Sequence, residues 1–386
     1  MECGVGLGIV VLTVATAVVF DFTNGFHDTA NAMATTIATR ALPPRVAVGV
    51  AACLNFAGAF ISVAVAATIA SGIVDQTGVT DPIIFAGLVG AILWNVITWY
   101  LGIPSSSSHA LVGGVVGAVL AGIGSSGVIW SGIASKVVIP AVLAPFICGA
   151  AAFIATKLSF GLTRNQSEEE TTRGFRLSQI ASSSMVALAH GTNDAQKTMG
   201  VIVLTLVAGG RLSANAGVPV WVKFVCATAI ALGTFSGGWR VIRTLGTRVT
   251  EILSPQGFSA ETSSATAILS SSYFGFSLST TQVVSGGVMG AGLGRVGGVV
   301  HWGVVRNMVV AWVVTMPAAG AMGALAEELV SGFANATVGV AVVACAAVAI
   351  LAAILVLARR HGNVTADNVL EPAPQRVQPT QAMAGA

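Results

Sequence analysis

Two short polar strings lie inside apolar stretches of this chain and resemble each other. The first reads NGFHDTANA at 24–32, and the second reads HGTNDAQKT at 190–198. Asp28 and Asp194 are 166 positions apart, and each follows a glycine by three positions. A carboxylate within a membrane costs about 2.5–3.5 kcal/mol on insertion scales, so it must be paired, hydrated or bound to an ion. We predict that both aspartates handle a coupling cation or proton; the alternative is that each caps a helix.

A second pair of strings is rich in hydroxyl side chains. Residues 102–109 (GIPSSSSH) match residues 275–282 (GFSLSTTQ) at an offset of 173, and each precedes a glycine-rich run. Hydroxyls and free N–H groups at a helix start form an anion cradle that suits phosphate, helped by the helix dipole. The alternative is a turn in which the hydroxyls satisfy their own backbone. The predicted anion-binding residues are Ser106, Ser107, Ser108, Ser279, Thr280 and Thr281.

A lysine breaks the correspondence between the two polar strings. Lys197 occupies the place that Asn31 has in the first string. At membrane depth a lysine needs a carboxylate or an anionic substrate as its partner, and it could replace a sodium ion or couple transport to protonation. The alternative is that its side chain extends to an interface. We predict that Lys197 belongs to the coupling site.

Three histidines lie in or beside these strings. Because histidine titrates near neutral pH, His27 and His190 are candidates for proton handling in the coupling site. His109 is a weaker candidate, since Gln282 takes its place in the second half of the chain.

The composition indicates an integral membrane protein. Of the 386 residues, 54% are hydrophobic and 9% are charged, with a mean hydropathy of +0.85, whereas roughly a quarter of the residues in a soluble domain are charged. Uncharged runs of about 20 residues, long enough to span a bilayer as helices, recur along the chain. They are 4–20, 46–70, 82–101, 137–156, 181–208, 218–235, 296–321 and 336–358. We therefore predict an all-α integral membrane protein embedded in a lipid bilayer.

Several functional classes lack their signatures in this sequence. The net charge of +3 is too small to indicate a nucleic-acid partner. There is no Walker A string, HExxH string or Cys/His metal spacing, and the five cysteines are scattered without CxxC spacing. We predict no ATP hydrolysis, no resident metal and no cofactor, and we do not expect an enzyme.

The duplicated strings divide the chain into two halves. We predict a first transmembrane repeat at 1–162, a polar linker at 163–176, a second repeat at 177–358 and a disordered polar tail at 359–386. Repeats that gather polar residues at matching points are typical of transporters built from inverted repeats. We expect a helical bundle of two inverted repeats, each with a broken helix and a Ser/Thr-rich helical hairpin. A homodimer is left open.

The strings resemble the inorganic phosphate transporter (Pit) family, in particular its bacterial low-affinity branch. NGFHDTANA and AHGTNDAQK are similar to the two signature strings of that family, and IPSSSSH and SLSTTQ are similar to its two serine/threonine hairpins. GTFSGGWRVIRTLG and AWVVTMPAA resemble second-half sequences of the branch. The resemblance covers nearly the whole chain except the polar tail, with four motifs in the right order.

The resemblance implies an inverted-repeat bundle in the bacterial inner or plasma membrane that carries inorganic phosphate with a cation gradient. It assigns the substrate and cation region to Asp28, Asn31, Asn193 and Asp194, and phosphate binding to 106–108 and 279–281. The NDAQK form is similar to the proton-coupled branch, which is associated with neutral divalent metal–phosphate complexes. Gln282 stands where the family usually has histidine, so a proton role is in doubt at that position.

We expect a secondary active transporter of inorganic phosphate, with a proton favoured over sodium as the coupling cation. A sulfate transporter of the same fold and a sodium-coupled phosphate symporter are the alternatives. An anion channel is disfavoured because bare buried carboxylates repel anions. A membrane-embedded enzyme that uses the two aspartates is disfavoured by the repeated serine strings and the missing metal ligands.

Overall fold

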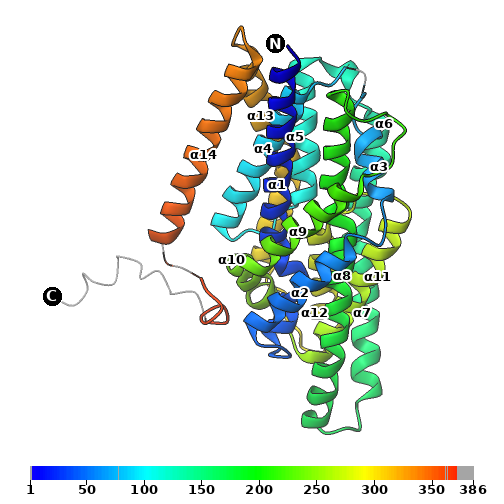
Figure 1. Cartoon of the computed structure of the whole chain (residues 1–386). Coiled ribbons are helices and arrows are strands. Elements are labelled where there is room, and N and C mark those ends of the chain that lie inside the picture. Colours follow the sequence, from blue (N-terminus) through cyan, green and yellow to red (C-terminus); the bar gives the residue numbers. More distant parts are fainter. Residues whose placement is uncertain (1, 77, 361, 363, 372–386) are drawn as a thin grey trace, which may run out of the picture.

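The computed structural model describes residues 2–76, 78–360, 362 and 364–371, and this part of the chain is built of helices joined by loops and turns (Figure 1). The helices up to residue 162 are α1 (Glu2–Ala38), α2 (Pro44–Gly58), α3 (Ala64–Ser71), α4 (Asp81–Leu101), α5 (Ser107–Gly122), α6 (Trp130–Ile133) and α7 (Ile139–Leu162). They are followed by α8 (Glu168–Ala208), α9 (Val220–Ser236), α10 (Trp239–Arg243), α11 (Ser254–Tyr273), α12 (Thr280–Gly294), α13 (Trp302–Ser331) and α14 (Ala336–Arg360).

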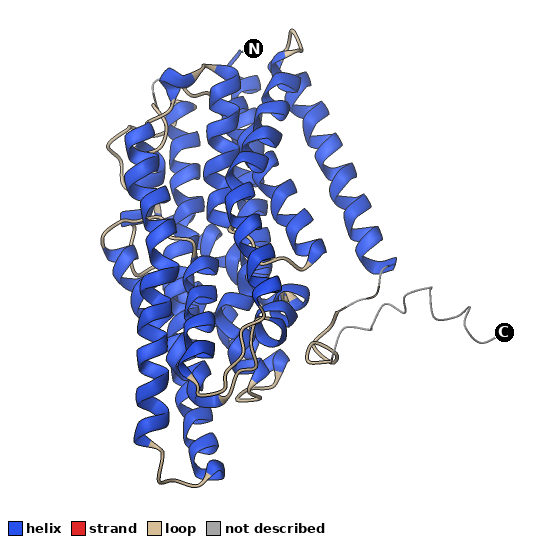
Figure 2. Ribbon diagram, turned by 180° about the vertical axis from the view of Figure 1, so that it is seen from behind, coloured by secondary structure: helices blue, strands red, loops and turns tan. Residues whose placement is uncertain are grey.

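Several of these helices are long and apolar enough to cross a membrane, which confirms the prediction of an all-α membrane protein. In the described part, the qualifying segments are Gly6–Ala38, Asp81–Leu101, Trp130–Leu162, Trp302–Ser331 and Ala336–Arg360. The segment Trp239–Arg248 follows α9 at a bend of 60°, and the two together would form one further span. Figures 1 and 2 show one bundle of roughly aligned helices, with α14 inclined away from it.

The helices of the two halves follow the same order, and their closest contacts are paired. A Cβ atom added to Gly117 of α5 would lie 1.9 Å from the carbonyl oxygen of Gly320 in α13. One added to Gly290 of α12 would likewise lie 1.9 Å from the carbonyl oxygen of Gly149 in α7. The hairpin of the first half therefore packs against α13 of the second, and the hairpin of the second packs against α7 of the first. Figure 1 shows α1 starting at one end of the bundle and α8 entering from the opposite end.

The broken helix expected in each repeat does not lie at the polar strings. Both α1 and α8 are continuous through them. Their glycines are contact points instead: a Cβ at Gly25 would lie 2.2 Å from the carbonyl oxygen of Ile230, and one at Gly191 would lie 2.2 Å from that of Asn55. Small residues let helix backbones approach closely in membranes. The interruptions lie elsewhere, between α2 and α3 and between α9 and α10.

The two hydroxyl-rich strings form the turns of helical hairpins, as expected. Residues 102–106 connect α4 to α5, and residues 274–279 connect α11 to α12. Gly102 and Gly275 stand at matching places after the first helix of each hairpin, with φ of 66° and 71°. This left-handed conformation is open to glycine because it has no Cβ, which explains the glycine at both turns.

Part of the predicted disordered tail is packed against the bundle. Arg45 forms an ion pair with Asp367 at 3.0 Å, and the Arg243 side chain donates to the carbonyl oxygen of Val369 at 3.3 Å. Val369 itself is buried. Residues 364–371 therefore differ from the expectation, because a cationic side chain of α10 binds their backbone. The remainder of the predicted tail, 372–386, lies outside the described residues.

The paired glycine contacts lead to a stability prediction. Gly117→Ala and Gly290→Ala should each destabilise the protein by about 1–3 kcal/mol, because the new methyl group overlaps a backbone carbonyl of the facing helix. The matched control is Gly49→Ala in α2, where nothing lies within 4 Å of the added Cβ. Thermal unfolding of the purified protein measures the effect. Equal midpoints for all three variants would show that the close contacts do not determine helix packing.

Candidate functional site

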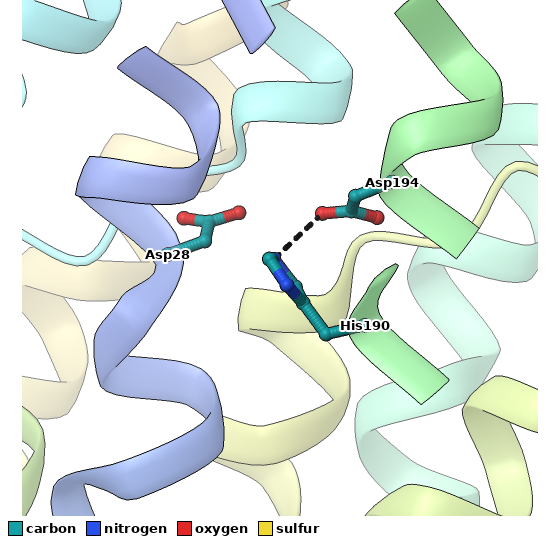
Figure 3. A group of neighbouring side chains, drawn as sticks. All are labelled: Asp28, His190 and Asp194. Carbon is teal, nitrogen blue, oxygen red and sulfur yellow. Dashed lines mark ion pairs between the residues drawn. The ribbon is translucent and has the colours of Figure 1, made fainter. Parts of the chain in front are cut away.

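Two aspartates and a histidine from the two long polar helices meet in the interior. Figure 3 shows Asp28 of α1 and Asp194 and His190 of α8 pointing toward one another. Their side-chain ligand atoms all lie within 4.8 Å of one another, and all three residues are buried. The structure thus brings together two carboxylates that the sequence separates by 166 positions.

Each carboxylate of this pair has a basic partner on its own helix. His190 Nε2 lies 3.2 Å from Asp194 Oδ2, one helical turn away. Lys197 Nζ forms an ion pair with Asp194 Oδ1 from the opposite side, at the (i, i+3) spacing that places side chains on one helix face. On α1, His27 Nδ1 lies 2.6 Å from Asp28 Oδ1. All of these side chains are at most 1% exposed, so water does not screen the pairs.

The hydroxyls of the hairpin tips bind the same carboxylates in a paired pattern. Ser107, the first residue of α5, donates to Asp28 Oδ2 at 2.7 Å. Thr280, the first residue of α12, donates to Asp194 Oδ2 at 3.1 Å. Ser107 Oγ also lies 2.7 Å from Asn24 Oδ1, and its single hydrogen can serve one of these acceptors at a time. The second helix of each hairpin therefore begins with a hydroxyl residue that binds the buried aspartate of its own half.

A second set of contacts crosses between the halves. Asn31 of α1 donates from Nδ2 to Thr281 Oγ1 at 3.0 Å, and Lys197 of α8 donates from Nζ to Ser108 Oγ. Lys197 also donates to the backbone carbonyl of Leu278 at 2.8 Å. Asn31 and Lys197 occupy matching positions, as do Ser108 and Thr281, so the same pairing appears twice. These bonds hold the tip of each hairpin against the helix of the other half that contains the polar string.

The remaining predicted residues surround this centre in supporting positions. The Ser106 and Ser279 hydroxyls accept from the backbone N–H of the residue three positions later, as helix caps do, at 3.2 Å and 3.3 Å. This matches the alternative of hydroxyls that satisfy their own backbone. Asn193 donates to Ser272 Oγ of α11 at 2.9 Å. His109 is buried and lines, with Gln282, an apolar cavity of about 880 Å³ between α7, α12 and α13.

Among the buried acids that the sequence analysis missed, two lie on or against α1 and α8. Glu261 of α11 accepts hydrogen bonds from four side chains on α1 and α8. These are Thr35 at 2.6 Å, Thr36 at 2.7 Å, Ser182 at 2.5 Å and Gln179 at 3.1 Å. Asp21 of α1 is fully buried one helical turn before Asn24. Neither acid has a counterpart in the other half, where the matching positions hold Leu88 and Ala187, so the duplication gave no signal for them.

The arrangement can hold an anion and a cation side by side. The N-termini of α5 and α12 both lie at the centre and bring free N–H groups and the positive ends of two helix dipoles, which favour an anion. Asp28 and Asp194 lie within hydrogen-bond reach of the same tips and need positive charge nearby. Buried charges of both signs thus lie where the tips of two helical hairpins meet inside a membrane-spanning bundle. This arrangement is that of a membrane transporter.

Comparison with known proteins gives the particular family. A model described as the phosphate transporter family matches residues 24–166 and 159–323. The chain is 54% identical over 365 residues to a "probable low-affinity inorganic phosphate transporter" of Mycobacterium bovis, covering 94% of this chain and 88% of the relative. It is 44% identical over 326 residues to a protein of the same description from Rhizobium meliloti, covering 84% and 97%. The chain belongs to the phosphate transporter family.

A solved structure described as "the sodium-dependent phosphate transporter" has the same fold. It superposes with a TM-score of 0.76 at 25% sequence identity, covering 84% of this chain and all of the solved chain. The expected resemblance and the expected cell-membrane location are therefore confirmed. The relatives are transporters rather than enzymes, as the sequence predicted.

The ion pair between the two charged residues of α8 leads to a prediction. Lys197→Met should destabilise the protein by about 3–5 kcal/mol, because it leaves Asp194 buried without its lysine. Adding Asp194→Asn to Lys197→Met should restore much of the stability. Thermal unfolding of the two variants and of the control Lys157→Met, whose lysine lies over the Phe153 ring, measures the difference. Identical midpoints for the single and double variants would show that the pair is not energetically coupled.

Proposed function

We propose that the protein is a secondary active transporter that moves inorganic phosphate inward together with protons. The observation that carries this proposal is the meeting of two hydroxyl-bearing helix N-termini with a buried Asp–Lys cluster. Such a site offers donors to an anion and positive charge to offset it, while its carboxylates need a mobile cation. The anion and the cation would be coupled because they bind at the same place.

The phosphate would bind between the two hairpin tips. Ser107 and Thr280 donate to carboxylates in the present arrangement, and Ser108 and Thr281 link the halves. Hydroxyls rotate freely, so they can turn from carboxylate to phosphate oxygens when the anion enters. Asn31 would add an amide donor in the first half, as Lys197 would add an ammonium in the second. Asn193 faces Ser272, so its contribution would be to position α8 against α11.

The fixed charge of Lys197 favours protons over sodium. It contacts the Asp194 carboxylate and a hairpin hydroxyl, where the matching residue of the first half is the neutral Asn31. A resident ammonium supplies one positive charge that a transporter without it would have to take from solution. Less mobile charge is then needed in each cycle, and protons can provide it through the buried acids and histidines.

We also propose that the two halves act as inverted repeats around this site. The support is the paired glycine contacts, the paired hydroxyl–carboxylate bonds and the opposite entry of α1 and α8 (Figure 1). In such transporters, alternating access arises when one repeat moves against the other around a fixed midplane site. The cross-half bonds of Asn31 and Lys197 would be broken and remade in each cycle.

Two alternatives concern the ions. The solved structure of similar fold is sodium-dependent by its own description, so a sodium-coupled mechanism is the first alternative. Sulfate would fit the same donors, because both anions are tetrahedral. The group of Asp28, His190 and Asp194 also offers three ligand atoms to a divalent cation carried as cargo in a metal–phosphate complex. Phosphate uptake measured with and without magnesium would test whether the metal–phosphate complex is the substrate.

The hydroxyls of the hairpin tips give the first transport prediction. Replacing Ser107 and Thr280 together by Ala should raise the half-saturating phosphate concentration by about 10- to 100-fold, if each loses a charge-assisted bond of about 1–3 kcal/mol with partial compensation. The matched control is Ser135→Ala with Thr228→Ala, whose hydroxyls donate to carbonyls of their own helices. Phosphate uptake into proteoliposomes, with sulfate as competitor, is the assay. Unchanged kinetics in the first pair would rule out this phosphate site.

The lysine gives the second transport prediction. Uptake by the unmodified protein should respond to an imposed pH gradient and be largely indifferent to sodium, because Lys197 supplies a fixed positive charge. Lys197→Asn, which copies the residue of the first half, should impair accumulation or make it depend on another cation. Uptake into proteoliposomes with separately imposed pH and sodium gradients distinguishes proton coupling from sodium coupling. Strict sodium dependence without any response to pH would contradict the proposal.

A further inference from the structure

Asp21 is a buried carboxylate beside the transport site that takes no part in the contacts described above. It lies on α1 three residues before Asn24 and seven before Asp28, spacings that place all three on one helical face. Seven residues of α-helix correspond to about 10 Å, so Asp21 is displaced along α1 from the paired aspartates. Its exposed fraction is 0%.

The carboxylate of Asp21 has no bonded partner among the described residues. Both of its oxygen atoms are buried, and neither is in an ion pair or a well-aligned hydrogen bond in this arrangement. The Thr198 hydroxyl and the Asn24 amide are its near polar neighbours. The titratable and charged groups that face it are Asp194 and Lys197 of α8 and the Cys226 thiol of α9.

The charges of the site single out this residue. Asp28 has a histidine partner, and Asp194 has a histidine and a lysine. No ion pair in the described part of the chain reaches Asp21. An isolated carboxylate buried in this way costs several kcal/mol, and it avoids the cost by taking up a proton. Of the three buried aspartates, Asp21 is thus the one for which a proton is the available neutralising charge.

Asp21 also departs from the duplication in a meaningful way. The matching position in the second half holds Ala187, so the fold itself does not require an acid there. Glu261 is a second charged departure, and Lys197, which stands in place of Asn31, is a third. Asp21 thus adds an acid to the first half, and Lys197, whose charge acts on it, adds a base to the second.

We propose that Asp21 carries one of the coupled protons through the transport cycle. Its carboxylate takes a proton from water on the outer side, stays neutral while it is buried without a charged partner, and releases the proton to water on the inner side. The anionic form is transient and is stabilised by Thr198, Asn24 and Lys197. This inference rests on the proposed proton coupling and names a residue that performs it.

The test compares Asp21→Asn with the unmodified protein in proteoliposomes. The amide has nearly the shape of the protonated acid but cannot release a proton. Exchange of phosphate between equal pools should persist with its half-saturating concentration little changed. The number of protons taken up per phosphate, measured with a pH indicator, should fall by one. The accumulation ratio at a pH difference of one unit should therefore fall about tenfold, because each coupled proton contributes one factor of ten.

Two further variants keep the test decisive. Glu327→Gln is the matched control: this buried acid of α13 lies beside Gly122, at the far end of α5 from Ser107, and its loss should leave the proton count unchanged. Asp21→Ala, which copies position 187, replaces Asp21→Asn if the amide prevents folding, with the same expected result. An unchanged proton count in the Asp21 variants of a proton-coupled protein would overturn the inference and leave the proposed function standing. Uptake by the unmodified protein without proton movement would overturn both.

Discussion

The burial of charge in a membrane is the constraint on which the rest of this structure depends. Asp28, Asp194 and Lys197 are at most 1% exposed, where an unpaired charge would cost several kcal/mol. Each has an oppositely charged or histidine partner on its own helix and further hydrogen bonds to the tips of two helical hairpins. The long uninterrupted α1 and α8, the inward N-termini of α5 and α12 and the cross-half bonds all serve this arrangement. A transporter can use such a site because the substrate and the coupling cation replace some of those neutralising bonds.

Close packing of backbones makes the charge cluster possible. Gly25 and Gly191, inside the polar strings, bring α1 and α8 into contact with α9 and α2, while Gly117 and Gly290 pack each hairpin against a long helix of the other half. Dispersion contacts at these points are the main packing energy available in lipid, since apolar burial gives little there. The same glycines therefore contribute to the stability of the bundle and fix how closely the helices that carry the site approach their neighbours.

Much of the site could be predicted from the duplication in the sequence, since paired polar strings identify Asp28, Asp194 and the hydroxyl residues of both hairpin tips. The duplication also indicated that Lys197 departs from its counterpart. It misled about helix continuity, because Gly25 permits either a break or a close contact and only the neighbour Ile230 decides which. Asp21 could not be found in this way, since it has no acidic counterpart and its importance depends on the absence of a partner in three dimensions.

The central claim is that phosphate binds between the N-termini of α5 and α12 beside the Asp28–Asp194 pair. The most direct test is a cryo-electron microscopy structure of the protein in lipid nanodiscs, determined with and without saturating phosphate. Added density is expected within hydrogen-bond distance of the Ser107, Ser108, Thr280 and Thr281 hydroxyls in the phosphate-bound map. Phosphate density elsewhere, with the bonds from Ser107 to Asp28 and from Thr280 to Asp194 unchanged in both maps, would contradict it.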